Sequence, residues 1–109
     1  MTRIIPSREI MPPIKKVRNN DFRKAWARDR YSCYWCGTNY RIHTHHIIGA
    51  AGRSDEPCNL SRFCGPCHDE IHADWRGTFK RVIEAKEKHD LHEMDLERLR
   101  VLYQQELPL

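Results

Sequence analysis

The chain has 109 residues, enough for one domain with a modest hydrophobic core. Charged residues make up 31% and apolar residues 39%, and the formal net charge is +4. No apolar run approaches the length of a membrane span, and the N-terminal residues lack the continuous apolar stretch of a secretory signal. We therefore expect a cytoplasmic protein without a membrane partner. In that reducing setting, cysteines are more often metal ligands or catalytic groups than disulfides, and the chain has five cysteines beside seven histidines.

Residues 1–20 are predicted to form a basic, mostly irregular N-terminal arm, because three prolines interrupt them and no periodicity is sustained. Basic residues outnumber acidic ones over the first 30 positions by nine to three. Lys15, Lys16 and Arg18 are therefore candidate contacts to DNA phosphates. The alternative is a solvated arm without a binding role.

The middle of the chain, residues 21–76, is predicted to form a compact core. A short helix is expected over residues 22–30, with Asp21 as its cap and with Phe22 and Trp26 packing from one face. A tight turn follows, then two strands separated by a loop, and then a helix whose first turn contains Pro66. The predicted ranges are 33–37 for the turn, 41–48 and 60–63 for the strands, and 49–59 for the loop.

Residues 77–109 are predicted to form a helical C-terminal tail that packs on the core. Phe79, Val82, Ile83 and Lys86 follow helical spacing, and so do the leucines between positions 96 and 102. A break is expected around residues 89–92, with Asp90 or Asp95 as the cap of the last helix.

Two Cys-x2-Cys pairs flank the predicted strands: Cys33 with Cys36, and Cys64 with Cys67. Two thiolates three positions apart on a turn can share one ion, and two such turns complete a tetrahedron of sulfurs. Four sulfur ligands without an open position are typical of structural zinc. Two disulfides or a redox-active pair are the alternatives. Cys58 stands outside both pairs and is interpreted as a small buried apolar residue.

A second group of candidate ligands consists of histidines. His68 and His72 are four residues apart, so a helix places them on one face, where they can hold one ion. His45 and His46 are adjacent on the first predicted strand and must leave it on opposite faces. One of the two can therefore join a metal while the other meets a different group. Three imidazoles leave room for water and substrate, as in a catalytic metal site.

Several short motifs follow one another in chain order: Cys33-x2-Cys36, His45-His46-Ile47-Ile48, Asn59-Leu60 and Cys64-x2-Cys67-His68-x3-His72. Through these residues the sequence resembles the HNH endonuclease family, in its small phage and bacterial form with a four-cysteine zinc. The motif covers residues 33–72. The resemblance implies an α+β fold with a small ββα-metal core, stapled by zinc and flanked by helices.

The resemblance also implies roles for individual residues. His46 matches the general base, and His45 matches the metal ligand that precedes it. His68 and His72 match the helix ligands, and many zinc-stapled members of the family lack a histidine at the position of His72. Asn59 matches the central asparagine, which orients the base in some members and supports the metal site in others. Arg53 is a candidate phosphate contact from the loop, with a solvated loop charge as the alternative.

These residues predict a metal-dependent DNA endonuclease or nickase that leaves 5′-phosphate and 3′-hydroxyl ends. Its expected cofactors are a structural Zn²⁺ and one catalytic divalent ion: Mg²⁺, Mn²⁺, Ni²⁺ or Zn²⁺. The expected partner is DNA, in double-stranded form, cut with low sequence specificity. Phage origin, and phage packaging proteins as further partners, are implied by the resemblance only. The alternatives are a catalytically silent zinc module that binds nucleic acid or protein, and a ribonuclease of the same fold.

Overall fold

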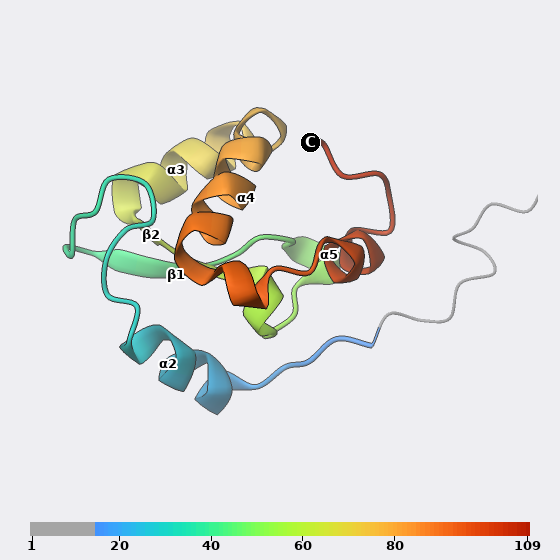
Figure 1. Ribbon diagram of the computed structural model, residues 1–109, viewed down its shortest axis with the longest axis horizontal. Helices are drawn as coiled ribbons and strands as arrows, with labels where there is room; N and C mark the ends of the chain where they lie inside the picture. Colours follow the sequence, from blue (N-terminus) through green and yellow to red (C-terminus); the bar gives the residue numbers. More distant parts are fainter. Residues whose placement is uncertain (1–14) are drawn as a thin grey trace, which may run out of the picture.

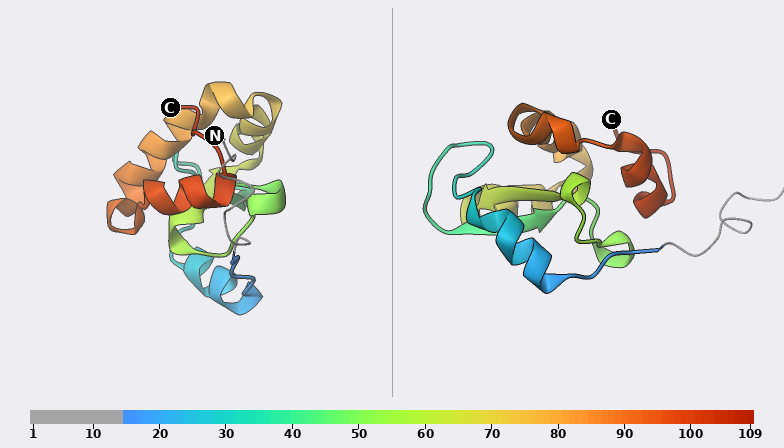
Figure 2. Two further views of the ribbon diagram at one scale, coloured as in Figure 1. Left: turned by 90° about the vertical axis from the view of Figure 1, so that its right-hand side faces the viewer. Right: turned by 60° about the horizontal axis from the view of Figure 1, so that its bottom comes forward.

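The computed structural model describes residues 15–109. Two antiparallel strands lie at its centre, with α3 and α4 on one side and α2 on the other (Figures 1 and 2). The longer elements, in chain order, are α2 (Asn20–Arg28), β1 (Ile42–His46), β2 (Leu60–Cys64), α3 (Gly65–Ala73), α4 (Trp75–Asp90) and α5 (Leu96–Tyr103). Short 3₁₀ turns are η1 (Ala50–Gly52), η2 (Pro57–Asn59) and η3 (Leu91–Glu93). The predicted α+β class is confirmed.

None of the helices formed by residues 15–109 has the length and apolar character needed to cross a membrane.

The two strands pair in a register that sorts the site residues between the faces of the sheet. Thr44 lies opposite Arg62, and His45 lies opposite Ser61. Because neighbouring side chains leave a strand on opposite faces, His45 points toward α3 while Thr44 and His46 point toward α2. β1 begins one residue later than predicted, since Arg41 has a left-handed φ of 55°, which a strand residue does not adopt.

Helix α2 begins at Asn20, and its cap is Asn19. The predicted cap, Asp21, is wrong: it lies inside the first turn. The Asn19 side chain accepts from the Phe22 N–H, while its own backbone N–H donates to the Asp55 carboxylate at 2.9 Å. That second contact fixes Asn19 in an extended conformation, as a helix cap requires. Trp26 is buried, whereas Phe22, its predicted packing partner, is only partly buried.

The hydrophobic core lies between the sheet and the C-terminal helices, so the helical spacing expected for residues 77–109 is confirmed. Phe63 of β2 and Ile71 of α3 are buried with Phe79 and Val82 of α4 and Leu99 of α5. Helix α4 is longer than predicted, because it starts before Gly77 and continues to Asp90. Asp95 caps α5 by accepting from the Arg98 N–H.

A buried ionic cluster joins Arg30, two residues after α2, to the end of α4 and to η3. Lys86, with no exposed surface, donates to Asp90 at 3.2 Å and to Glu93 at 2.8 Å. Arg30 donates to the same two carboxylates at 3.1 and 2.7 Å, and the Tyr34 hydroxyl also donates to Asp90. Buried charges are tolerated when paired and hydrogen-bonded in this way. This cluster therefore fixes the position of α2 relative to the core.

We expect Asp90→Asn to lower the free energy of unfolding by about 3 kcal/mol at neutral pH, because the buried Lys86 and the partly buried Arg30 lose a shared anion. Burial opposes ionisation of Asp90, but the Tyr34 hydrogen bond and the Lys86 charge hold its pKa below the ordinary value. Its stabilising contribution is therefore complete above the unfolded-state pKa of about 3.9 and is lost as the pH falls through the lower folded-state pKa.

Urea denaturation of both proteins between pH 7 and pH 3 measures this effect. The difference between wild type and Asp90→Asn should shrink below about pH 4. Glu87→Gln, an exposed change on the same helix, is the control and should alter stability by less than about 0.5 kcal/mol. A difference for Asp90→Asn that stays constant down to pH 3 would contradict the assignment.

Candidate functional site

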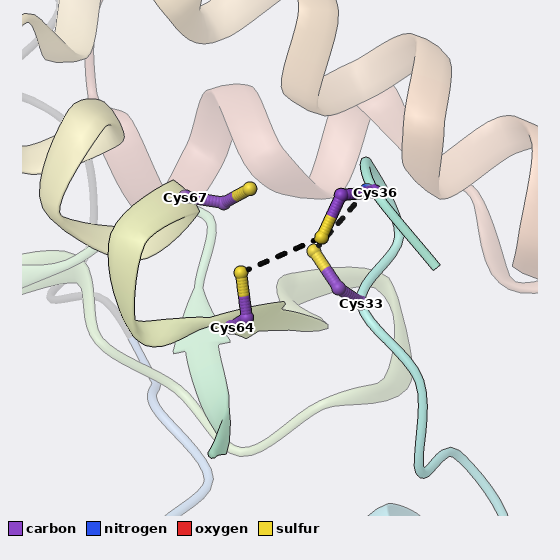
Figure 3. Close-up of side chains that lie close together, drawn as sticks. All are labelled: Cys33, Cys36, Cys64 and Cys67. Carbon is purple, nitrogen blue, oxygen red and sulfur yellow. Dashed lines mark hydrogen bonds between the residues drawn. The ribbon is translucent and has the colours of Figure 1, made fainter. Parts of the chain in front are cut away.

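The four paired cysteines converge on one point between a turn and the start of α3 (Figure 3). Their sulfur atoms all lie within 4.8 Å of one another, and the Cys36 and Cys64 sulfurs are 3.6 Å apart. Ligands placed tetrahedrally at about 2.3 Å from an ion are separated by roughly 3.8 Å. The four thiols can therefore hold a metal ion in a closed, all-sulfur site. All five cysteines of the chain are free thiols.

The turn that carries Cys33 and Cys36 is shaped by its backbone. The Cys33 N–H donates to the Thr38 carbonyl, and Gly37 closes the turn with a φ of 78°, which glycine adopts without strain. Burial opposes ionisation of Cys33, yet backbone N–H groups, those of Trp35 and Cys36 among them, point at its sulfur and lower its pKa to about 7. The turn thus favours the thiolate, the form that binds metals.

Cys58 lies outside the sulfur cluster, as the sequence predicted. It is buried, and burial raises the pKa of its thiol to about 11. Such a thiol is neutral at physiological pH and packs as a small apolar side chain.

Three histidines form a second cluster, in which β1 supplies His45 and α3 supplies His68 and His72. Their ring nitrogens lie within 4.8 Å of one another, and the Nε2 atoms of His68 and His72 are 3.0 Å apart. Burial, together with the charges of the other two rings, lowers the pKa of His45 to about 3. His45 is therefore neutral at physiological pH, as a metal ligand must be. His72 is exposed, so the cluster is open on one side.

Helix α3 serves both clusters with consecutive residues. Cys67 lies in its first turn and points toward the other sulfurs, while His68 joins the histidines. Successive residues of a helix are rotated by about 100° around its axis, so the side chains of Cys67 and His68 point in different directions. The two candidate metal sites are thus positioned by one rigid element.

His46 takes no part in the histidine cluster and pairs with Asp55 instead. Its Nε2 lies 2.8 Å from the Asp55 carboxylate, which also accepts from Arg23 at 3.2 Å and from the Asn19 N–H. An ionised carboxylate only accepts hydrogen bonds, so the proton is on Nε2 and the lone pair is on Nδ1. Burial lowers the pKa of His46, and Asp55 offsets part of that shift.

Sequence reasoning missed Asp55. It lies in an irregular loop, where neither helical nor strand periodicity indicates which side chains point inward. Its only signal in the sequence is that it is an acidic residue nine positions after His46.

A pocket of about 250 Å³ connects these groups. Its lining includes His46 from one face of β1, the three clustered histidines, and Arg53 from the loop. Arg53 is exposed and forms no ion pair with any residue from 15 to 109. The pocket therefore presents metal-ligand nitrogens, an oriented imidazole and a positive charge to the same small volume.

The basic residues predicted to contact DNA from the arm lie outside that pocket. Lys15, Lys16 and Arg18 are exposed, and Lys16 donates to the Ala51 carbonyl of the loop at 2.6 Å. The remainder of the predicted arm, residues 1–14, lies outside the described residues.

Asn59 is fully buried and holds the loop between the strands. Its side chain accepts from the Ile48 N–H at 2.6 Å and donates to the carbonyls of Ile48 and Ser54 at 3.1 and 3.0 Å. Its hydrogen bonds thus reach loop backbone and none of the histidines. The arrangement makes Asn59 a positioning residue, because the loop it fixes carries Arg53 and Asp55.

We expect Asn59→Ala to lower the free energy of unfolding by about 3 kcal/mol, since it leaves buried backbone groups of Ile48 and Ser54 without partners. Ser61→Ala is the matched control: Ser61 is also fully buried but donates a single hydrogen bond, to the His45 carbonyl, so about 1 kcal/mol should be lost. Chemical denaturation measures both values. Equal losses would show that the three Asn59 hydrogen bonds add little stability.

Comparison of the chain with protein-family models, with curated proteins and with solved structures finds no significant match. The resemblance of residues 33–72 to the HNH family therefore remains a prediction from the sequence.

Proposed function

We propose that the protein is a metal-dependent endonuclease that hydrolyses phosphodiester bonds in DNA and leaves 5′-phosphate and 3′-hydroxyl ends. One observation supports this most strongly. His45 and His46 are neighbours on β1 but belong to different groups, and both line one pocket. Phosphodiester hydrolysis needs a charge-neutralising ion and a base near the same phosphorus atom. In this proposal β1, β2 and α3 form the ββα-metal core.

Two ions are part of the proposal. The four cysteines would hold Zn²⁺ as a structural ion, since their donor set is all sulfur and closed. His45, His68 and His72 would hold Mg²⁺, Mn²⁺, Ni²⁺ or Zn²⁺, with at least one position left for water or phosphate. When bound, this second ion would neutralise negative charge on the phosphate and stabilise the departing 3′ oxygen.

The remaining steps fall to side chains near the pocket. His46 accepts a proton from the attacking water through Nδ1, because Nε2 is already engaged by Asp55. Asp55 fixes the ring orientation and stabilises the positive charge that develops on it. The water oxygen bonds to phosphorus as the bond to the 3′ oxygen breaks, and the departing 3′ oxygen takes a proton from solvent water. Arg53 binds a phosphate oxygen from the exposed side of the pocket.

The proposed partner is double-stranded DNA, bound with low sequence specificity. Phage packaging proteins are carried over as candidate partners from the family resemblance, without support from the geometry of the pocket.

A plasmid-nicking assay tests the proposal. The protein is first dialysed until only the tightly held zinc remains, and Mg²⁺, Mn²⁺, Ni²⁺ or Zn²⁺ is then added separately. We expect supercoiled plasmid to be nicked only after metal addition. DNA ligase should reseal the nicks without prior kinase or phosphatase treatment, because ligase requires a 5′-phosphate beside a 3′-hydroxyl.

Two outcomes would redirect the assignment. Absence of cleavage with all four ions, in a protein that keeps its zinc and binds DNA, would favour the catalytically silent zinc module. Faster cleavage of RNA than of duplex DNA of the same sequence would favour a ribonuclease.

A further inference from the structure

A groove of about 390 Å³ lies between α2 and the face of the sheet that carries Thr44. Its lining includes four basic side chains, those of Arg23, Lys24, Arg28 and Arg62, and no acidic side chain of the described part of the chain. We call this feature the basic groove. Arg23 is paired with Asp55, but the other three form no ion pair within residues 15–109.

Arg62 is the most informative member of the groove. It is half-buried on β2, where its Nε donates to the Arg30 carbonyl and its Nη1 donates to the Thr44 hydroxyl, both at 2.7 Å. Burial lowers its pKa. Two neutral acceptors thus hold a guanidinium in place without cancelling its charge. Charges removed from water are normally paired, so this arrangement suits an anion that arrives from outside.

Lys24 and Arg28 add two further positive charges along α2. They are four residues apart and exposed, so they lie on one face of the helix. Like charges at this spacing destabilise a helix. An anion bound between α2 and the sheet would relieve that repulsion together with the uncompensated charge of Arg62.

The groove borders the pocket that contains the histidines, because Thr44 lines both. Arg23, at the edge of the groove, also donates to Asp55, the partner of His46. A polymer with one charge per monomer can therefore place one monomer at the histidines and the adjacent monomers in the groove. Nucleic acid carries such closely spaced charges along its backbone.

We propose that the basic groove binds the phosphate backbone of DNA next to the phosphate that lies at the histidines. The proposal rests on the proposed function, and it adds a binding track formed by Lys24, Arg28 and Arg62 to the residues that the sequence motif indicates. Because arginine and lysine contact phosphates in any sequence context, this track contributes affinity rather than sequence preference.

The test compares two double variants of the full chain by fluorescence anisotropy with labelled duplex DNA, without added divalent metal so that no cleavage occurs. Lys24→Gln/Arg28→Gln removes two charges from the groove, and glutamine has similar helix propensity. Lys80→Gln/Lys88→Gln removes two exposed charges from α4 and is the control. Both variants lower the net charge from +4 to +2, so an effect of overall charge is matched. Circular dichroism verifies that both fold.

Each phosphate contact contributes about 0.9 to the slope of log K against log salt concentration. We therefore expect wild type and the α4 variant to lose about tenfold more affinity between 50 and 200 mM salt than the groove variant does. Equal slopes for the two double variants would overturn the proposal that the groove binds DNA, as would a wild-type protein that does not bind DNA. A protein that binds DNA with this slope difference but never cleaves it would refute the endonuclease and leave the groove standing.

Discussion

His46→Ala is expected to slow DNA cleavage by about 10²–10⁴-fold while DNA and both metal ions still bind, because the change removes the proposed general base but no proposed ligand. His46 faces Asp55 rather than the histidine cluster, and its Nδ1 is the nitrogen left free to accept a proton. Single-turnover cleavage at saturating metal measures the rate, and calorimetric titration measures binding of the catalytic ion.

His45→Ala and His68→Ala are the matched controls for this prediction. Each removes one of three clustered nitrogens, so each should weaken binding of the catalytic ion and leave the sulfur-bound zinc in place. The assignment of the two neighbours on β1 fails if His46→Ala loses the ion or cleaves at the wild-type rate.

Cys33→Ser is expected to lose the zinc and to leave most of the chain unfolded. Structural zinc contributes about 10–16 kcal/mol of apparent binding free energy in small modules, whereas whole domains are stable by about 5–15 kcal/mol. Cys33 supplies one of the four clustered sulfurs, so serine at this position removes one of the four ligands. Zinc content by mass spectrometry and folding by circular dichroism measure the loss.

Cys58→Ala is the control for the zinc site. Cys58 is also buried but lies outside the sulfur cluster, so its variant should keep one zinc and lose only about 1–2 kcal/mol of stability. If Cys33→Ser keeps its zinc and its circular dichroism, the four-sulfur assignment is wrong.

Short-range spacing explains why both candidate ligand clusters could be anticipated from the sequence. Two residues separate the cysteines of each pair, and three separate His68 from His72, so local backbone geometry alone brings each pair together. The alternation of a strand likewise separates His45 from His46 without reference to the rest of the fold. The structure adds that the two cysteine pairs meet, and that His45 reaches the helix pair.

Contacts that depend on loops or on distant segments could not be anticipated in the same way. The Asp55 partner of His46 lies in an irregular loop, and the cap of α2 is Asn19 because a contact to that same Asp55 holds it extended. Helical spacing placed Lys86 on the inward face of α4, but no spacing rule predicts which carboxylates pair with it. Asp90, considered as a helix cap, is instead the shared anion of Arg30 and Lys86.

The buried ionic cluster also joins segments of the chain that are synthesised at different times. The two strands pair with each other within residues 42–64, whereas Arg30 pairs with carboxylates that follow it by 60 and 63 residues. Chains fold from the N-terminus as they leave the ribosome. Arg30, two residues after α2, therefore gains its ion pairs only after residue 93 has been synthesised, whereas the contacts of Asn19 and Arg23 to Asp55 can form earlier.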